Sequence, residues 1–533
     1  MGKIIVNEKK EGNQMSVARK TAKSAMTIMV FLLFSRFLGF LREQLIAARY
    51  GAGVEADAYF IAVAASTFLG AAINAVLHTT LIPIFSEIEE KKGKQAKIQH
   101  MNNILNVVVL AMLGLTIIGW IGSPYIIRVM ARGFEGEQFQ LAVTLNRIGF
   151  PIIISIGMAS VLTGFLQSNG KFGVPAATGI PMNIVFIGFL VFLARSYGIE
   201  GLMVASLVGW FTTVLIQMPS SYKLGYAYQW RLDLNDPYLK KVLILAGPIV
   251  IGTAVQQLNT IIDRSLASGL EVGSISALNF ASKVDTLVIA LFVSAITTAI
   301  FPTLAQEYGK QNISGVKNVM GHGINMILLI MVPATVGIIV LARPLIQVLF
   351  ERGEFTARGT EMTAIALGFY CVGLVGFSIR ELLSKVFYAM HDTRTPMING
   401  VIAVGINIIF NFLLIGPLKH GGLALATSIS GLTSAVLLAV NLKKRLGKIG
   451  GRNIIISFLK VSFAALMMGV MVYLTHQVTS GYLYGSFLLS VTSLGITVLV
   501  GFLVYFALCY FLKVREFHIL LNQLMGKVRG TLN

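Results

Sequence analysis

The feature that most constrains this chain is a series of long apolar segments that runs along almost its whole length. Fourteen of them have about the 20 residues that an α-helix needs to cross the hydrocarbon of a bilayer. They cover residues 25–49, 57–86, 102–126, 143–166, 174–195, 200–220, 242–264, 274–302, 322–349, 361–387, 396–416, 421–442, 454–475 and 485–512. Only 12% of all residues are charged. Backbone groups in lipid must be paired within the chain, so we expect an all-α polytopic membrane protein with 14 transmembrane helices.

Lysine and arginine are distributed unevenly between the two sides of the predicted membrane. The loops 89–100, 221–241 and 441–453 are rich in both, whereas the loops on the opposite side carry few. Short basic loops stay in the cytoplasm, so the pattern predicts that both termini are cytoplasmic. The net charge of +20 then reflects topology and attraction to anionic membrane lipids, and no nucleic-acid partner is expected.

The sequence contains no pattern typical of an enzyme. Its two cysteines, Cys371 and Cys509, lie in apolar runs and predict neither a disulfide framework nor a metal cluster. There is no nucleophile elbow and no Walker-type phosphate loop. A membrane glycosyltransferase or polymerase is the alternative from the enzyme class, but the loops are too short to present paired catalytic carboxylates.

The chain resembles itself at an offset of about 220 residues. The stretches that begin at Ala131, Phe165 and Tyr197 parallel those that begin at Glu351, Val386 and Leu418, in the same order. Six predicted spans separate the copies, so both have the same orientation. A parallel repeat implies a pseudo-twofold axis along the membrane normal and a central cavity that works by alternating access.

The repeat divides the chain into regions. We expect a cytoplasmic N-terminal segment, two six-helix lobes, two further helices outside the repeat, and a cytoplasmic tail. Their residues are 1–24, 25–222, 238–442, 454–512 and 513–533.

The first predicted span carries charge deep in the membrane. At 100° per residue, Arg36, Arg42 and Glu43 fall within one arc of about 140°, and the rest of the circle is almost entirely apolar. A charge at this depth is costly unless it faces a partner or a water-filled cavity. An internal ion pair of Arg36 with Glu43 is one interpretation. Because the arginines outnumber the glutamate, a cavity that binds phosphate is the interpretation we favour.

Further polar residues lie in spans 7, 8, 11 and 12. Lys283 and Asp285 lie in span 8. In span 7 Asn259 and Asp263, and in span 11 Asn407 and Asn411, are four residues apart and share a helix face. Together with Thr427 in span 12, these oxygens suit Na⁺, although hydrogen bonding between helices would use the same residues.

Several stretches resemble one transporter family. "SRFLGFLRE" from Ser35, "ARYGAGVEADAYFIA" from Ala48, "LFERGEFTA" from Leu349, "FYAMHDTRTP" from Phe387 and "IGPLKHGGLA" from Ile415 are similar to the MurJ (MviN) family. These are lipid II flippases of the MOP exporter superfamily, with roles in peptidoglycan biosynthesis, cell wall biogenesis and cell shape. The likeness implies a bacterial inner-membrane protein whose partner is lipid II. It would act as a monomer alongside the cell-wall synthesis machinery, and its last two helices would form a groove for the undecaprenyl tail.

The resemblance also implies roles for individual residues. Arg36 and Arg42 match arginines of the family's first span, Asp57 matches the aspartate that follows, and Lys283 takes the place of an arginine in span 8. Asp285 lies one residue before the position of the family's acidic residue, which is Thr286 here.

A coupling ion is implied as well, and no other cofactor. Some members bind sodium between spans 7, 11 and 12, where Asn407, Asn411 and Thr427 match. The ligand from span 7 would be Asp263 or Asn259.

Two other transport functions remain as alternatives at this stage. One is a flippase for another polyprenyl-linked glycan, such as a teichoic acid, capsule or O-antigen unit. The other is a multidrug/cation antiporter of the same superfamily. The basic character of the predicted cavity disfavours the antiporter. The expected driving force for flipping is the membrane potential, with sodium as the expected coupling ion.

Overall fold

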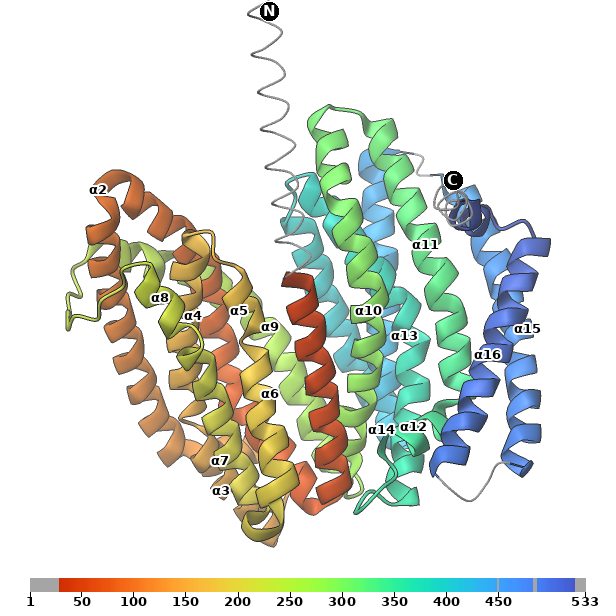
Figure 1. Cartoon of the computed structure of the whole chain (residues 1–533), viewed down its shortest axis with the longest axis horizontal. Helices are drawn as coiled ribbons and strands as arrows, with labels where there is room; N and C mark the ends of the chain where they lie inside the picture. Colours follow the sequence, from red (N-terminus) through yellow and green to blue (C-terminus); the bar gives the residue numbers. More distant parts are fainter. Residues whose placement is uncertain (1–27, 448–449, 483–486, 523–533) are drawn as a thin grey trace, which may run out of the picture. The chain divides into compact units, whose positions relative to one another are not determined.

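The structure, a computed structural model, describes residues 28–447, 450–482 and 487–522 (Figure 1). All regular secondary structure in these ranges is helical. Within the described residues, ten helices are long and apolar enough to cross a membrane, which confirms an all-α multi-pass membrane protein. The total of fourteen spans remains a prediction. The predicted N-terminal segment, 1–24, lies outside the described residues, as do the last residues of the tail.

The helices group into two compact units. Unit 1 comprises the chain up to Arg49 and from Ala58 to Gln257, and unit 2 comprises Tyr50–Asp57 and Leu258–Asn533. The short segment between the first two helices therefore belongs to unit 2, whereas the helices that it joins belong to unit 1. The lobe boundaries expected from the repeat, 25–222 and 238–442, remain predictions.

Unit 1 begins with a helix over residues 28–50. It continues with α2 (Val54–Met130), α3 (Gly136–Gly149), α4 (Ile152–Ser168), α5 (Gly173–Ala177), α6 (Gly179–Gly188), the π-helical turn η1 (Phe189–Leu193), α7 (Ala194–Leu215) and α8 (Met218–Lys223). Figure 1 shows α2 folding back on itself, and Gly93 inside it has a left-handed φ of 80° that glycine adopts at little cost. Buried side chains of α2 and α4, among them Phe85, Met101 and Phe165, form a core of this unit.

The loop after α8 is bound to α2 by side chains that were not singled out from the sequence. Asn102, Asn103 and Asn106 donate to the carbonyls of Ala227, Asp233 and Arg231 at 2.8–2.9 Å. At the end of the loop, His100 Nδ1 lies 2.5 Å from Asp236 Oδ2. The connection to the next helix is therefore held against unit 1.

Helix α9 (Pro237–Ser268) begins in unit 1 and ends in unit 2. Unit 2 then contains α10 (Ser274–Gly309), α11 (Ile313–Val340), α12 (Ala342–Phe350), α13 (Ala357–Ala389), α14 (Arg394–Leu446), α15 (Gly451–Tyr482) and α16 (Phe487–Phe511). Helices α13 and α14 approach closely, because a Cβ on Gly373 would lie 2.6 Å from the Cα of Ser428. A core of buried side chains from α10, α11, α13, α15 and α16 fills this unit.

The backbone has the same unusual conformation at positions that the sequence repeat aligns. Gly198 in α7 has φ 58° and ψ −155°, and Lys419 in α14 has φ 50° and ψ −130°. Gly170 and His391, which the repeat also aligns, have φ values of 71° and 59°. A left-handed residue is uncommon outside glycine, so its recurrence at aligned positions agrees with a duplicated chain.

The two helices outside the repeat pack on α11. Tyr505 of α16 donates to the carbonyl of Leu329 at 2.7 Å. Beyond α16, the buried Glu516 accepts hydrogen bonds from Asn325 of α11 at 2.6 Å and from Ser457 of α15 at 3.2 Å. The described start of the C-terminal tail is thus held by an acidic residue within unit 2.

Candidate functional site

The charged residues of the first helix are held by α6 in unit 1. Arg42 donates from Nη1 to Asn183 Oδ1 at 3.2 Å and from Nη2 to Glu43 Oε1 at 2.8 Å. Its guanidinium also lies 4.8 Å from the centre of the Phe186 ring, a cation–π distance. The alternative interpretation, an ion pair of Arg36 with Glu43, is corrected here, since the arginine that pairs with Glu43 is its neighbour Arg42.

Asn183 organises this cluster, and the sequence reasoning did not identify it. Its Nδ2 donates to the carbonyls of Ser35 at 3.2 Å and Gly179 at 2.7 Å, while its Oδ1 accepts from Arg42. The two helices approach so closely that a Cβ on Gly179 would lie 2.0 Å from Ser35 Oγ. A buried asparagine in an apolar helix was the available signal, because such a group requires hydrogen-bond partners.

Arg36 lies apart from this cluster. Its side chain is exposed in the structure, whereas Glu43 is 3% exposed. Of the residues predicted on the first helix, Arg42 and Glu43 are therefore brought together and Arg36 is not. A role of Arg36 in binding substrate stays a prediction.

Asp57 binds the start of helix α10 within unit 2. Its carboxylate accepts hydrogen bonds from the backbone N–H groups of Gly273 at 2.7 Å and Ser276 at 2.8 Å, and from the Ser276 hydroxyl. These groups form the first turn of α10, so Asp57 caps a helix more than 200 residues away in the chain. With both oxygens occupied and the side chain 2% exposed, this geometry favours a structural role over the predicted contact with substrate.

The five residues predicted as sodium ligands lie together in unit 2. Asp263 accepts from Asn411 at 2.5 Å and from Asn259 at 3.3 Å. Asn411 donates to Asn407 at 2.9 Å, and Asn407 donates to Thr427 at 3.3 Å. We call these five residues the amide cluster.

Oxygen atoms converge within the amide cluster. The amide oxygen of Asn407 lies 2.8 Å from that of Asn259 and 3.2 Å from Oδ1 of Asp263. The amide oxygen of Asn411 is buried and has no hydrogen-bond partner among the residues that the structure describes. Turning the Asn407 amide over would convert the first two contacts into hydrogen bonds. Turned over, the Asn407 amide donates to Asn259 and Asp263 and accepts from Thr427, so its polar atoms are paired within the amide cluster.

The two predicted charges of span 8 lie on α10 in unit 2. Lys283 is half-buried. Asp285 is 8% exposed, and its Oδ1 has no hydrogen-bond partner among the described residues.

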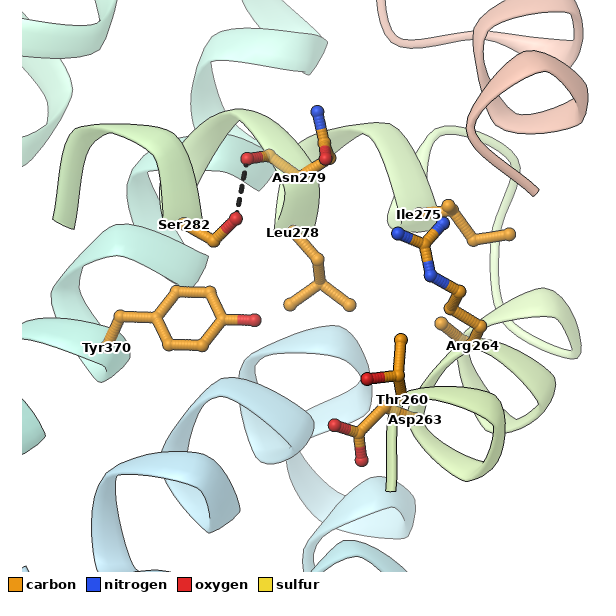
Figure 2. A pocket seen from close by; sticks show the side chains of 9 residues that line it. Thr260, Asp263, Arg264, Ile275, Leu278, Asn279, Ser282 and Tyr370 are labelled. Atoms are coloured by element: carbon orange, nitrogen blue, oxygen red, sulfur yellow. Dashed lines mark hydrogen bonds between the residues drawn. The ribbon is translucent and has the colours of Figure 1, made fainter. Parts of the chain in front are cut away.

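A pocket of about 150 Å³ lies beside the amide cluster. Helices α9, α10 and α13 line it with Thr260, Asp263, Arg264, Ala267, Ile275, Leu278, Asn279, Ser282 and Tyr370. In Figure 2 Tyr370 enters from one side and Arg264 from the other, with Leu278 between them. Asp263 therefore belongs both to the pocket wall and to the amide cluster.

Comparison with known proteins identifies the family. A family model described as "Lipid II flippase MurJ" matches residues 46–493. The chain belongs to the MurJ family. It is 31% identical over 501 residues to a probable lipid II flippase MurJ of Rhizobium tropici, covering 92% of this chain and 93% of that protein. It is 30% identical over 493 residues to a probable lipid II flippase MurJ of Rickettsia prowazekii, covering 91% and 97%.

Solved structures agree with this assignment. A structure described as lipid II flippase MurJ in an inward closed conformation matches with a TM-score of 0.78 and 27% identity, covering 92% of this chain and 99% of that one. An inward-facing MATE multidrug transporter of the MOP superfamily matches with a TM-score of 0.67 at 15% identity, covering 78% and 96%, which shows a shared fold. The MurJ family thus has structural neighbours in the MOP superfamily, as the sequence resemblance implied.

Proposed function

We propose that this chain moves lipid II, the undecaprenyl-diphosphate-linked peptidoglycan precursor, from the inner to the outer leaflet of the bacterial cytoplasmic membrane. The observation that carries the proposal is the family match over residues 46–493. Relatives named lipid II flippase that cover 91% and 92% of the chain support it. The protein has both termini in the cytoplasm and acts by alternating access as a transporter, not as an enzyme. It works as a monomer alongside cell-wall synthesis proteins.

Arg42 is the strongest candidate for binding the diphosphate. Its guanidinium is a planar fork that matches phosphate oxygens in a bidentate manner. Glu43 and Asn183 occupy its terminal nitrogens, while its buried Nε has no hydrogen-bond partner among the described residues. In this proposal Glu43 holds Arg42 in place until a diphosphate competes for it, and Arg36 and Lys283 supply further positive charge.

The amide cluster is proposed as a sodium site. One carboxylate with neutral amide and hydroxyl oxygens is a donor set suited to a hard cation. The buried amide oxygen of Asn411, which has no hydrogen-bond partner among the described residues, supports this fit. Sodium would screen the negative charge of Asp263 and draw the side chains of α9 and α14 toward one point.

The energy for transport is proposed to come from the membrane potential, with inward sodium flux resetting the protein. With a negative cell interior, moving one negative charge outward is favoured by about 2.3 kcal/mol per 100 mV. The negative charges of lipid II therefore favour outward movement, while Na⁺ at the amide cluster would accompany the return.

A depletion strain and purified protein test this proposal. Expression of the chain should restore growth of bacteria depleted of their lipid II flippase, and proteoliposomes containing it should expose lipid II on the opposite leaflet. Arg42→Ala should fail in both assays. The control is Arg343→Ala, which removes an exposed arginine of α12 and should behave as the wild type. Protein that restores growth equally well with Arg42→Ala would contradict the assigned site, and wild-type protein that moves no lipid II would contradict the function.

A further inference from the structure

The pocket beside the amide cluster is lined by one basic, one acidic and four neutral polar side chains. Arg264 contributes the only basic side chain among the lining residues, and Asp263 the only acidic one. The hydroxyl groups of Thr260, Ser282 and Tyr370 and the amide of Asn279 complete the polar lining. The Ser282 hydroxyl donates to the carbonyl of Asn279 at 2.8 Å. The side chains of Arg264, Thr260, Tyr370 and Asn279 are of types that can donate hydrogen bonds. The pocket thus offers a guanidinium fork surrounded by neutral donors.

Asp263 is bonded mainly toward the amide cluster. Its Oδ1 accepts from Asn411 at 2.5 Å and its Oδ2 accepts from Asn259 at 3.3 Å. Its hydrogen-bonding capacity is therefore used largely outside the pocket, but its negative charge still acts on anything bound beside Arg264. At such short range that repulsion is considerable.

The size of the pocket limits what it can hold. Its volume of about 150 Å³ is below the roughly 300 Å³ at which sites for whole small-molecule ligands begin. It has room for one anionic group with some of its water, since a water molecule takes about 30 Å³. Helices α9, α10 and α13 line it (Figure 2), so a bound group would bridge three helices of unit 2.

We propose that this pocket binds a single anionic oxygen group, a phosphate or a carboxylate, through Arg264, and that a cation at Asp263 strengthens the binding. A cation at the amide cluster neutralises Asp263, which removes the repulsion and leaves the pocket with the positive charge of Arg264. Occupancy of the two neighbouring sites is then coupled, and by linkage the anion must strengthen cation binding by the same factor. This coupling rests on the sodium site proposed above, whereas binding of the anion to Arg264 does not.

The test measures binding of inorganic phosphate to the purified full-length protein in detergent. Phosphate is titrated while the thermal unfolding midpoint is followed, in Na⁺ and in K⁺ buffers of equal ionic strength so that screening is the same. We expect phosphate to bind about tenfold more tightly in Na⁺, within the usual range of coupling between sites. Equal affinity in both salts would overturn the coupling.

Two substitutions separate the parts of the proposal. Arg264→Gln should weaken phosphate binding at least about tenfold in both salts, as expected when a charged hydrogen-bond donor is lost. Asp263→Asn should bind phosphate with the same affinity in Na⁺ and K⁺, at least as tightly as the wild type in Na⁺. Asp263→Asn protein that still responds to sodium, or Arg264→Gln protein that binds like the wild type, would overturn it.

Controls guard against general salt effects and misfolding. Phosphate stabilises many proteins by exclusion from their surface, so Arg343→Gln, on an exposed part of α12, must respond as the wild type does. An equal rise of the midpoint in all variants would overturn the proposal. If Arg264→Gln does not fold, Tyr370→Phe removes one donor and should weaken binding several-fold; unchanged binding would overturn the proposal.

The source of the anionic group is identified by comparing probes. Tighter binding of phosphate or diphosphate than of acetate indicates a phosphate group as the ligand, and the reverse indicates a carboxylate; both outcomes support an anion pocket. Absence of binding of all three in Na⁺ would overturn it. Protein that shows this binding pattern but moves no lipid II would contradict only the transport function.

Discussion

The guanidinium of Arg42 and the carboxylate of its chain neighbour Glu43 form an ion pair of 2.8 Å inside unit 1. Consecutive residues of a helix point about 100° apart, so the long arginine side chain has to fold toward the glutamate. Asn183 and the Phe186 ring hold the guanidinium from the neighbouring helix. The result is an arginine whose charge is largely offset before any substrate arrives.

Glu43→Gln should lower stability while keeping the size of the side chain. The substitution leaves the Arg42 charge without its partner, and losing a hydrogen bond to a charged group costs about 2 kcal/mol. The measurement is the thermal unfolding midpoint in detergent for Glu43→Gln, Arg42→Met and the double variant. The double variant should be less destabilised than the sum of the single ones, and additive effects would show that the two residues are not coupled.

Asp57→Ala should destabilise unit 2 by about 1–2 kcal/mol, the usual cost of a lost helix cap. The carboxylate is bonded to Gly273 and Ser276 at the start of α10, and removing it leaves those N–H groups buried without a partner. Glu55→Ala is the matched control, because Glu55 lies in the same turn of α2 and is exposed. Equal midpoints for the two variants would argue against the capping role.

Gly373→Ala should be poorly tolerated and Gly368→Ala well tolerated, although both residues lie on α13. A Cβ at Gly373 would lie 2.6 Å from the Cα of Ser428 on α14, whereas one at Gly368 would have nothing within 4 Å. Overpacking of this kind costs about 1–3 kcal/mol. The yield of folded protein and its unfolding midpoint provide the measurement. Similar values for both variants would mean that α13 and α14 can separate without cost.

Replacing K⁺ by Na⁺ should raise the unfolding midpoint of the wild-type protein, and Asn411→Leu should abolish this response. A ligand that binds only the folded state stabilises it by about 2.7 kcal/mol at one hundred times its Kd. Asn399→Leu is the control, because Asn399 is another buried amide of α14, bonded to Asn441 at 3.1 Å. That variant should be less stable but should keep its response to sodium. A sodium response that survives in Asn411→Leu would exclude Asn411 as a ligand.

Acidification should weaken the attachment of the loop after α8. Burial raises the pKa of the Asp236 carboxyl, but hydrogen bonds from His100, Tyr238 and Asn103 outweigh it and hold that pKa below its usual range. A carboxyl with a lowered pKa stabilises the fold above its unfolded pKa of about 4, and this stabilisation is lost as pH falls through the folded value. The thermal unfolding midpoint should therefore decrease when the pH is lowered below about 4.

The variant Asp236→Asn tests this assignment. It should be less stable at pH 7 by about 2 kcal/mol and should show a shallower dependence on acid. Asp233→Asn changes a carboxylate of the same loop whose side chain is 45% exposed, so it should keep the wild-type acid dependence. If Asp233→Asn and not Asp236→Asn flattens the profile, the titrating group has been misassigned.

The class of structure, the repeat and the composition of one cluster could be predicted from the amino-acid sequence. Apolar runs of membrane-spanning length leave only helices, since lipid offers no partner for backbone groups. The spacing of Asn259 with Asp263, and of Asn407 with Asn411, places each pair on one helix face. In the structure these four side chains are hydrogen-bonded to one another. The family likeness indicated that these residues, from the predicted spans 7 and 11, lie close together.

Only the tertiary structure decided which residue each charged side chain meets. Helical periodicity specifies a face, but not the residue that the neighbouring helix presents to it. The Glu43 carboxylate is bonded to Arg42 rather than to Arg36. Asn183 holds that arginine from a helix that is far away in the sequence but adjacent in space. Asp57 caps α10, and its predicted contact with substrate stays a prediction. These contacts depend on close approach between segments far apart in the chain, which periodicity within one segment cannot specify.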